Sequence, residues 1–84
     1  MFYVYILRSR KDKKFYTGFT EDLQLRFEAH AKGTVPSTRD RLPLDLVYYE
    51  ACVDKLDACH REVYLKTAHG KHFIKQRLKS YLTG

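Results

Sequence analysis

The stretch that decides the fold is FYVYIL at residues 2–7. All of its residues are apolar or aromatic, and their types favour a strand, in which alternate side chains point to opposite faces. Tyr3 and Tyr5 would therefore share one face, and Val4 and Ile6 the other. A strand that is apolar on both faces has to be covered on both sides, so we expect it in the middle of a sheet flanked by helices.

A returning strand follows this stretch. The charged residues 8–14 predict a turn, and FYTGF at residues 15–19 reads as the second strand of a hairpin. With an even-numbered turn centred near Arg10 and Lys11, Tyr5 would lie directly opposite Tyr16. The two phenols would then share one face, while Gly18 would leave space beside the second strand.

A helix is expected after the hairpin. Thr20 is its predicted N-cap, Glu21 and Asp22 complement the positive end of its dipole, and Gly33 ends it after about residue 31. The segment 33–43 contains both prolines and two arginines, so it reads as a surface loop whose arginines are available to a ligand.

The second half of the chain predicts one more strand and two helices. Residues 46–53 form the third strand, and Asp54 caps a helix that runs to about residue 68. Gly70 then separates this helix from a last helix with a basic surface. The expected fold is α+β, with a small three-stranded antiparallel sheet, the element order ββαβαα and one domain over residues 1–84.

The charge of the chain indicates its class of partner. Its formal charge is +6, from 16 Lys and Arg against 10 Asp and Glu, which favours polyanions such as nucleic acid or an anionic membrane surface. No apolar run approaches the roughly 20 residues that span a bilayer, and the start of the chain does not resemble a signal peptide. We expect a cytoplasmic protein with no membrane partner and with Cys52 and Cys59 reduced.

Further polar side chains could join the two phenols. Arg26 and His30 lie four residues apart, so they project from the same side of the first helix. If that side meets the sheet, both side chains converge with the phenols. Glu62 on the second helix would be a fifth member of the group.

These residues resemble a known family. VYI at residues 4–6, followed ten residues later by YTG at residues 16–18, is similar to the paired motif of the GIY-YIG nucleases. Arg26 resembles the arginine on the helix after the second motif, and His30 resembles the His or Tyr one turn later. Glu62 resembles the metal-binding glutamate of the family. The resemblance spans nearly the whole chain and implies the GIY-YIG fold.

The resemblance also implies a reaction, the hydrolysis of a phosphodiester by an in-line water with one divalent metal, Mg²⁺ or Mn²⁺. Tyr5 would activate the water with help from His30, and Tyr16 would position the phosphate or the water. Arg26 would form paired hydrogen bonds to the phosphate. Glu62 would hold the metal, with waters and phosphate oxygens as its other ligands.

Cations outside this centre would hold the rest of the substrate. Arg39 and Arg41 on the loop and Lys66 one turn after Glu62 are candidate contacts to flanking phosphates. Such contacts give salt-sensitive affinity and read little sequence. Recognition should therefore be of nucleic-acid structure, and the resemblance implies DNA, in preference to RNA, in a repair or recombination context.

Each site residue also has an ordinary explanation. Tyr5 and Tyr16 could be a packed cross-strand aromatic pair, and Glu62 with Lys66 could be a surface ion pair. His30 could interact with the negative end of its helix dipole.

Two alternative functions follow from further features of the chain. It has Val and Thr where the family motifs have Gly and Ile, and it has no Asn. A nucleic-acid-binding module that lost turnover is one alternative. The second is an adaptor that guides a larger repair complex through a repair-protein partner.

Overall fold

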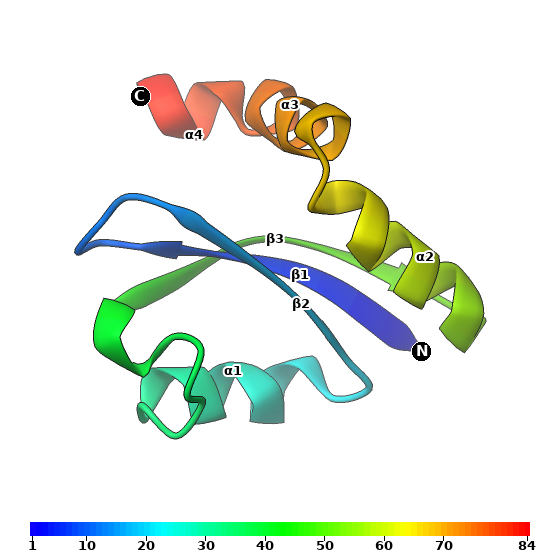
Figure 1. Cartoon of the computed structure of the whole chain (residues 1–84), viewed down its shortest axis with the longest axis horizontal. Helices are drawn as coiled ribbons and strands as arrows, with labels where there is room; N and C mark the ends of the chain where they lie inside the picture. Colours follow the sequence, from blue (N-terminus) through cyan, green and yellow to red (C-terminus); the bar gives the residue numbers. More distant parts are fainter.

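A computed structural model describes residues 1–84, and its centre is a three-stranded antiparallel sheet of order β2-β1-β3 (Figure 1). The strands are β1 (Phe2–Ser9), β2 (Phe15–Thr20) and β3 (Leu44–Cys52). The stretch at residues 2–7 therefore occupies the middle strand, which confirms the prediction from its two apolar faces. Cys52 and Cys59 are both free.

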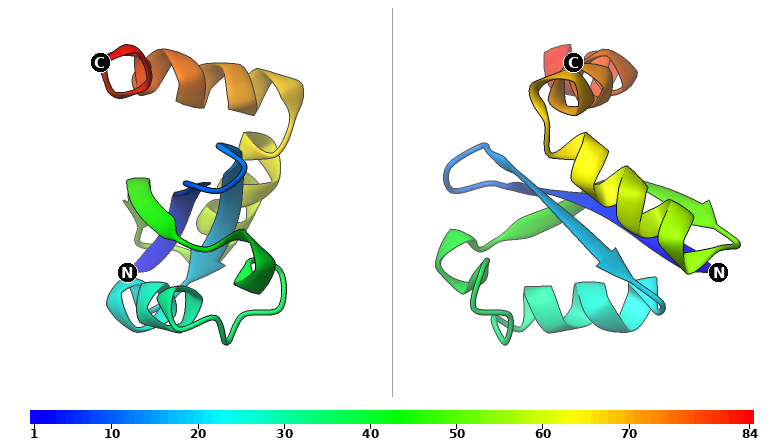
Figure 2. Two further views of the ribbon diagram at one scale, coloured as in Figure 1. Left: turned by 90° about the vertical axis from the view of Figure 1, so that its left-hand side faces the viewer. Right: turned by 45° about the vertical axis from the view of Figure 1, so that its right-hand side comes forward.

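Helices cover both faces of the sheet, so the molecule has three layers (Figures 1 and 2). One layer holds α1 (Leu23–Ala31), and the opposite layer holds α2 (Lys55–Leu65), α3 (Ala68–Arg77) and α4 (Lys79–Thr83). A short 3₁₀ turn, Arg39–Arg41, lies in the loop before β3. The order ββαβαα is confirmed, with the last helix divided into α3 and α4. None of the helices combines the length and the apolar character needed to cross a membrane.

Two apolar clusters hold the layers together. Val4 and Ile6 are buried against Ala58, Leu65 and Ile74 of α2 and α3. On the other face of β1, Tyr5 and Leu7 are buried with Leu44, and side chains of α1 pack against them. The alternation of residues 4–7 thus supplies both interfaces, and the face toward α1 carries the phenol.

The register of the hairpin differs from the predicted one. Tyr5 lies opposite Gly18, and Tyr16 lies opposite Leu7. The predicted pairing of Tyr5 with Tyr16 is therefore wrong by two residues, because Ser9 and Lys14 close the turn and Lys13 adopts a positive φ of 63°. A shift of two residues leaves every side chain on its predicted face, so both tyrosines still face α1.

Gly18 has a specific task in this register. A Cβ atom at this position would collide with the ring and the hydroxyl of Tyr5. The phenol of Tyr5 therefore lies across the backbone of β2, which only a glycine opposite it permits. The predicted space beside the second strand is present, and the ring of Tyr5 fills it.

Two helix boundaries also differ from the predicted ones. Asp22, and not Thr20, is the N-cap of α1, because its side chain accepts a hydrogen bond from the Leu25 amide. The second helix, α2, ends at Leu65 and not near residue 68. Thr67 is the N-cap of α3, and Gly70 lies inside α3. A Cβ atom at Gly70 would collide with the Leu65 backbone, so this glycine permits a close helix contact and does not separate two helices.

Candidate active site

A series of three buried side chains lies between the sheet and α1. Tyr5 Oη lies 2.8 Å from His30 Nε2, and His30 Nδ1 lies 2.7 Å from Thr38 Oγ1. The exposed fractions of Tyr5, His30 and Thr38 are 1%, 0% and 0%. Because each ring nitrogen has a partner, the imidazole is fixed between a strand and the loop that follows α1.

His30 is a neutral imidazole at neutral pH. Burial lowers its pKa to about 4, and the positive charge of Arg26 lowers the pKa as well. A neutral ring cannot stabilise the negative end of a helix dipole as a cation would, so the ordinary explanation for His30 is not supported. The ring instead has one N–H and one lone pair to share between Tyr5 and Thr38.

Arg26 approaches the same phenol from α1. Its Nε donates to Tyr5 Oη over 3.4 Å, a long hydrogen bond that raises the pKa of Arg26. Burial raises the pKa of Tyr5, while the hydrogen bond from Arg26 acts in the opposite direction and the charge of Arg26 does too. Tyr5 is therefore a neutral phenol at neutral pH, with a cation already beside its oxygen.

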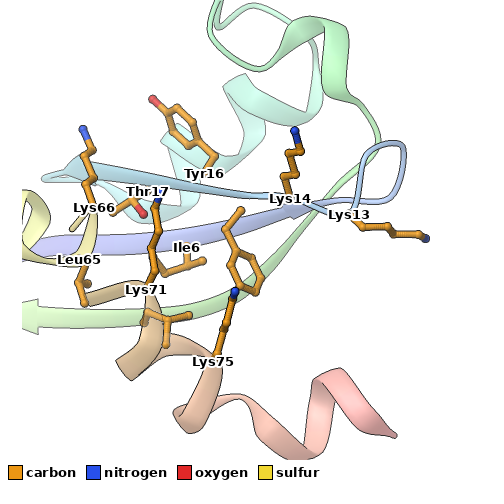
Figure 3. Close-up of a pocket in the computed structure, with 11 residues that line it drawn as sticks. Ile6, Lys13, Lys14, Tyr16, Thr17, Leu65, Lys66, Lys71 and Lys75 are labelled. Carbon is orange, nitrogen blue, oxygen red and sulfur yellow. The ribbon is translucent and has the colours of Figure 1, made fainter. Parts of the chain in front are cut away.

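Tyr16 joins this series at the edge of the sheet. Its ring centroid lies 6.4 Å from that of Tyr5 and 5.3 Å from that of His30. Tyr16 is only partly buried, and its side chain rises from β2 in Figure 3. It therefore connects the buried phenol to the molecular surface, where a substrate can reach it.

Glu62 lies on α2, in the layer opposite α1, but α2 packs against β1 and β2. Burial is the largest cause of the raised pKa of Tyr5, and the charges of Tyr16 and Glu62 raise it further. The carboxylate thus lies within electrostatic reach of the phenol. Lys66 Nζ lies 3.4 Å from the Glu62 carboxylate, so the predicted ion pair one helical turn apart is present.

The ligands available around Glu62 determine which metal ions this position could bind. No group of three or more His, Cys, Asp or Glu side chains lies close enough together to hold an ion. The Glu62 side chain is 23% exposed, so solvent can reach it. A single hard oxygen ligand with free solvent beside it fits a cation that keeps most of its waters, as Mg²⁺ does, and does not fit a closed zinc site.

The two loop arginines differ from one another. Arg39 is exposed and makes no side-chain hydrogen bond or ion pair. Arg41 Nε lies 2.9 Å from Asp12 Oδ2, and its terminal nitrogen lies 3.4 Å from the carbonyl of Phe15. The expectation that both arginines are available to a ligand is therefore correct only for Arg39, because Arg41 braces the hairpin turn.

Two features of the site are not evident from the sequence pattern. Thr38 completes the buried series, although the only local signal for it is a Ser-Thr pair in a loop. Five lysines from three separate segments line one groove together with Tyr16, and no local motif connects them. They are Lys13, Lys14, Lys66, Lys71 and Lys75.

Comparisons with known proteins identify the family of this chain. The GIY-YIG catalytic domain model matches residues 1–77. The UPF0213 protein CPE1444 of Clostridium perfringens is 46% identical over 67 residues, which cover 79% of this chain and 71% of the relative. A UPF0213 protein of Lacticaseibacillus paracasei is 40% identical over 82 residues, which cover 96% and 85% of the two chains.

A solved structure is similar as well. The solution NMR structure of the UPF0213 protein BH0048 from Bacillus halodurans has a TM-score of 0.57 and 35% sequence identity. The similarity covers 90% of this chain and 84% of the other. The shared sheet, the shared helix order and the family match lead to one conclusion: this chain belongs to the GIY-YIG nuclease domain family, beside the small bacterial UPF0213 proteins.

Proposed function

We propose that this protein is a metal-dependent endonuclease that hydrolyses phosphodiester bonds in DNA and selects its substrate by structure. One observation carries the proposal: within a GIY-YIG domain, the Tyr5 phenol has a guanidinium on one side and an imidazole on the other. This is the arrangement that a tyrosine needs to exchange a proton with water beside a phosphate. Membership of a nuclease family supports the reaction class.

Tyr5 and His30 form the proton path of the proposed reaction. When Thr38 accepts the Nδ1–H, the Nε2 lone pair of His30 accepts the Tyr5 O–H. The phenol proton can then pass to His30 as the phenol oxygen takes a proton from the attacking water. The pKa of Tyr5 is raised and that of His30 is about 4, so the proton stays on Tyr5 until a substrate changes the local charge.

Arg26 is the residue proposed to contact the scissile phosphate. Its Nε donates to Tyr5, and Tyr16 interacts with the guanidinium as well, but no carboxylate pairs with it, so its terminal nitrogens can turn to a two-point contact with phosphate oxygens. The same guanidinium then offsets the charge that develops on the phosphate, and its hydrogen bond holds the Tyr5 oxygen in place while the protons are exchanged. Tyr16, partly buried beside Tyr5 and His30, would orient the phosphate or the water.

Glu62 is the proposed metal ligand. Bound Mg²⁺ or Mn²⁺ supplies a Lewis acid that polarises the phosphate and neutralises part of its charge. Glu62 would have to leave Lys66 to hold the ion, and the freed ammonium group could then contact a flanking phosphate. Because Glu62 is the only carboxylate in the group, metal affinity should be low without nucleic acid.

The substrate class is proposed from charge. A net charge of +6 and an exposed Arg39 favour a polyanion, and DNA is proposed over RNA. The proposed setting is repair or recombination in the cytoplasm, with a repair protein as a candidate partner.

The test is a cleavage panel with purified full-length protein. Linear, nicked, forked and branched DNA and a forked RNA are incubated with Mg²⁺, with Mn²⁺ or with a chelator. We expect metal-dependent cleavage of a forked or branched DNA, and a loss of roughly 10²- to 10³-fold in turnover for Glu62→Ala and Arg26→Ala. Glu21→Ala, which removes an exposed carboxylate at the start of α1, is the matched control and should cut normally.

Two outcomes would contradict the proposal. If both folded variants cut at the wild-type rate, the site is assigned to the wrong residues. If the wild type binds DNA but never cuts it, the second candidate applies, a binding module or adaptor that kept the fold. The observation that favours this second candidate is the ion pair on Glu62, because Lys66 competes with a metal ion for the carboxylate.

A further inference from the structure

A groove beside Tyr16 is lined by five lysines, and four of them have no role in the proposed reaction. It has a volume of about 500 Å³ and lies between β2, the hairpin turn and α3 (Figure 3). We call it the lysine groove, after the residues that define it: Lys13, Lys14, Lys66, Lys71 and Lys75.

The charge of the lysine groove is almost uncompensated. None of its lining residues is acidic, and only Lys66 has a carboxylate partner, Glu62. Lys71 and Lys75 lie one turn apart on α3, and both side chains extend toward β2 in Figure 3. Like charges at this spacing repel one another, so a polyanion in the groove would relieve the repulsion.

The floor of the groove has a different character from its rim. Its apolar lining comes from Phe15, Leu65, Ile74 and Ile6, which belong to or pack against the buried core. Phosphate groups alone gain nothing from an apolar floor, whereas a nucleobase does, because its faces stack on aromatic and apolar side chains. A lysine rim over an apolar floor therefore fits a nucleotide better than it fits a simple anion.

We propose that the lysine groove is a nucleotide subsite, which holds one unstacked nucleotide with its base against Phe15 and its phosphates on the lysines. Tyr16 lines the groove and also lies beside Tyr5 and His30. The groove lies on the face of β2 toward α2 and α3, and the buried series lies on the face toward α1, so a nucleic-acid strand that passes around the β2 edge at Tyr16 would connect the groove to the phosphate that Arg26 would hold. This inference rests on the proposed function for the identity of that phosphate, but binding in the groove does not require cleavage.

The first test maps binding on the full chain by NMR. A short single-stranded DNA is compared with an abasic oligomer that carries the same number of phosphates, both in the absence of metal. The amide signals of Thr17, Lys71 and Lys75 should shift with both ligands and should saturate at a several-fold lower concentration of the ligand with bases. Equal affinities would mean that the groove holds phosphates only, and shifts confined to α1 would mean that it holds no nucleotide.

The second test compares two pairs of lysines with the same charge change. Lys71→Ala with Lys75→Ala should raise the Kd for the single-stranded DNA roughly tenfold and make its salt dependence shallower by about two phosphate contacts. Lys32→Ala with Lys55→Ala, two exposed lysines outside the groove, is the control and should change the Kd less than about twofold.

The two proposals can fail separately. Equal effects of the two lysine pairs would overturn the subsite, even if the wild type cuts DNA. A protein that never cuts DNA, but whose affinity depends on the groove pair and not on the control pair, would overturn the nuclease and keep the subsite.

Discussion

Two regions meet at Tyr16, and they are built in opposite ways. On one side, Tyr5, His30 and Thr38 are buried and joined by short hydrogen bonds. On the other side, the lysine groove is open and its cations have a single carboxylate partner. Proton transfer needs fixed geometry, whereas holding a polyanion needs only charge in the right area. Substitutions in the buried series should therefore alter turnover and stability, and substitutions in the groove should alter affinity.

The largest effect is expected from Tyr5→Phe. This change keeps the ring over Gly18 but removes the oxygen that joins Arg26 to His30. If the phenol takes part in the proton transfer, turnover should fall by at least roughly 10²-fold, measured as single-turnover cleavage. Stability should fall by about 1 to 3 kcal/mol, because His30 Nε2 loses its buried partner.

Tyr3→Phe is the control for this prediction. Tyr3 lies on the same strand and the same face, with its ring 6.1 Å from that of Tyr49 and no hydrogen bond from its hydroxyl to the buried series. It should cut and unfold like the wild type. If the Tyr5→Phe variant cuts at the wild-type rate, the proton from the attacking water is accepted by a group other than Tyr5.

A second prediction concerns the stability of the buried series as the pH changes. The His30 pKa is about 4 in the folded protein, against 6.5 for an ordinary imidazole. Between these values the unfolded state binds the additional proton, so the free energy of unfolding should fall as the pH drops from about 6.5 toward about 4. The total loss should be on the order of 3 kcal/mol, measured by urea unfolding across this range.

His30→Gln separates this effect from other titrations. The variant should lose stability at neutral pH, since the hydrogen bonds to Tyr5 and Thr38 are disturbed, but it should lose most of the slope between pH 6.5 and 4. The other three histidines are exposed and remain in place. A variant that keeps the full slope would show that His30 is not the group responsible.

A third prediction tests how closely the hairpin is fitted to Tyr5. Gly18→Ala should destabilise the protein by about 1 to 3 kcal/mol, because the added methyl group collides with the Tyr5 ring. Thermal unfolding of this variant is compared with that of Thr17→Ala, whose side chain faces the lysine groove. If Gly18→Ala is as stable as Thr17→Ala, the ring of Tyr5 does not lie across β2.

The same contrast explains which parts could be predicted from the sequence. The two-sided pattern at residues 2–7 predicts the middle strand, and Asp54 predicts the start of α2, because each signal is local. The turn at Lys13 depends on a positive φ that a lysine rarely adopts, so the predicted hairpin register is wrong. Tyr5 and Tyr16 are nevertheless brought together as predicted, because a shift of two residues preserves the face of a strand.

Long-range partners could not be predicted in the same way. Thr38 meets His30 only when the loop folds back over α1, and the lysine groove exists only because α3 lies across from the hairpin turn. The lysines of α3 appear in the sequence as an ordinary solvated face. Tertiary contacts of this kind leave no periodic signal along the chain.

The smallest effect is expected from the two loop arginines. The sequence predicts the same role for both, but in the structure only Arg41 is held in an ion pair. Arg39→Ala should weaken DNA binding a few-fold for all sequences alike and reduce the salt slope by about one, since the contact proposed for this exposed side chain is to a flanking phosphate. Arg41→Ala should have little effect on binding, because its Nε is already 2.9 Å from Asp12.

Arg41→Ala should instead act on the hairpin turn, and the Asp12 carboxyl reports this directly. The hydrogen bond from Arg41 is the first cause that lowers the pKa of Asp12 to about 2, so its NMR titration in the variant should move up toward the ordinary value of 3.8. In Arg39→Ala the Asp12 titration should stay where it is. If both variants weaken binding equally and the pKa of Asp12 does not move in Arg41→Ala, the ion pair does not persist in solution, and both arginines are free to hold flanking phosphates.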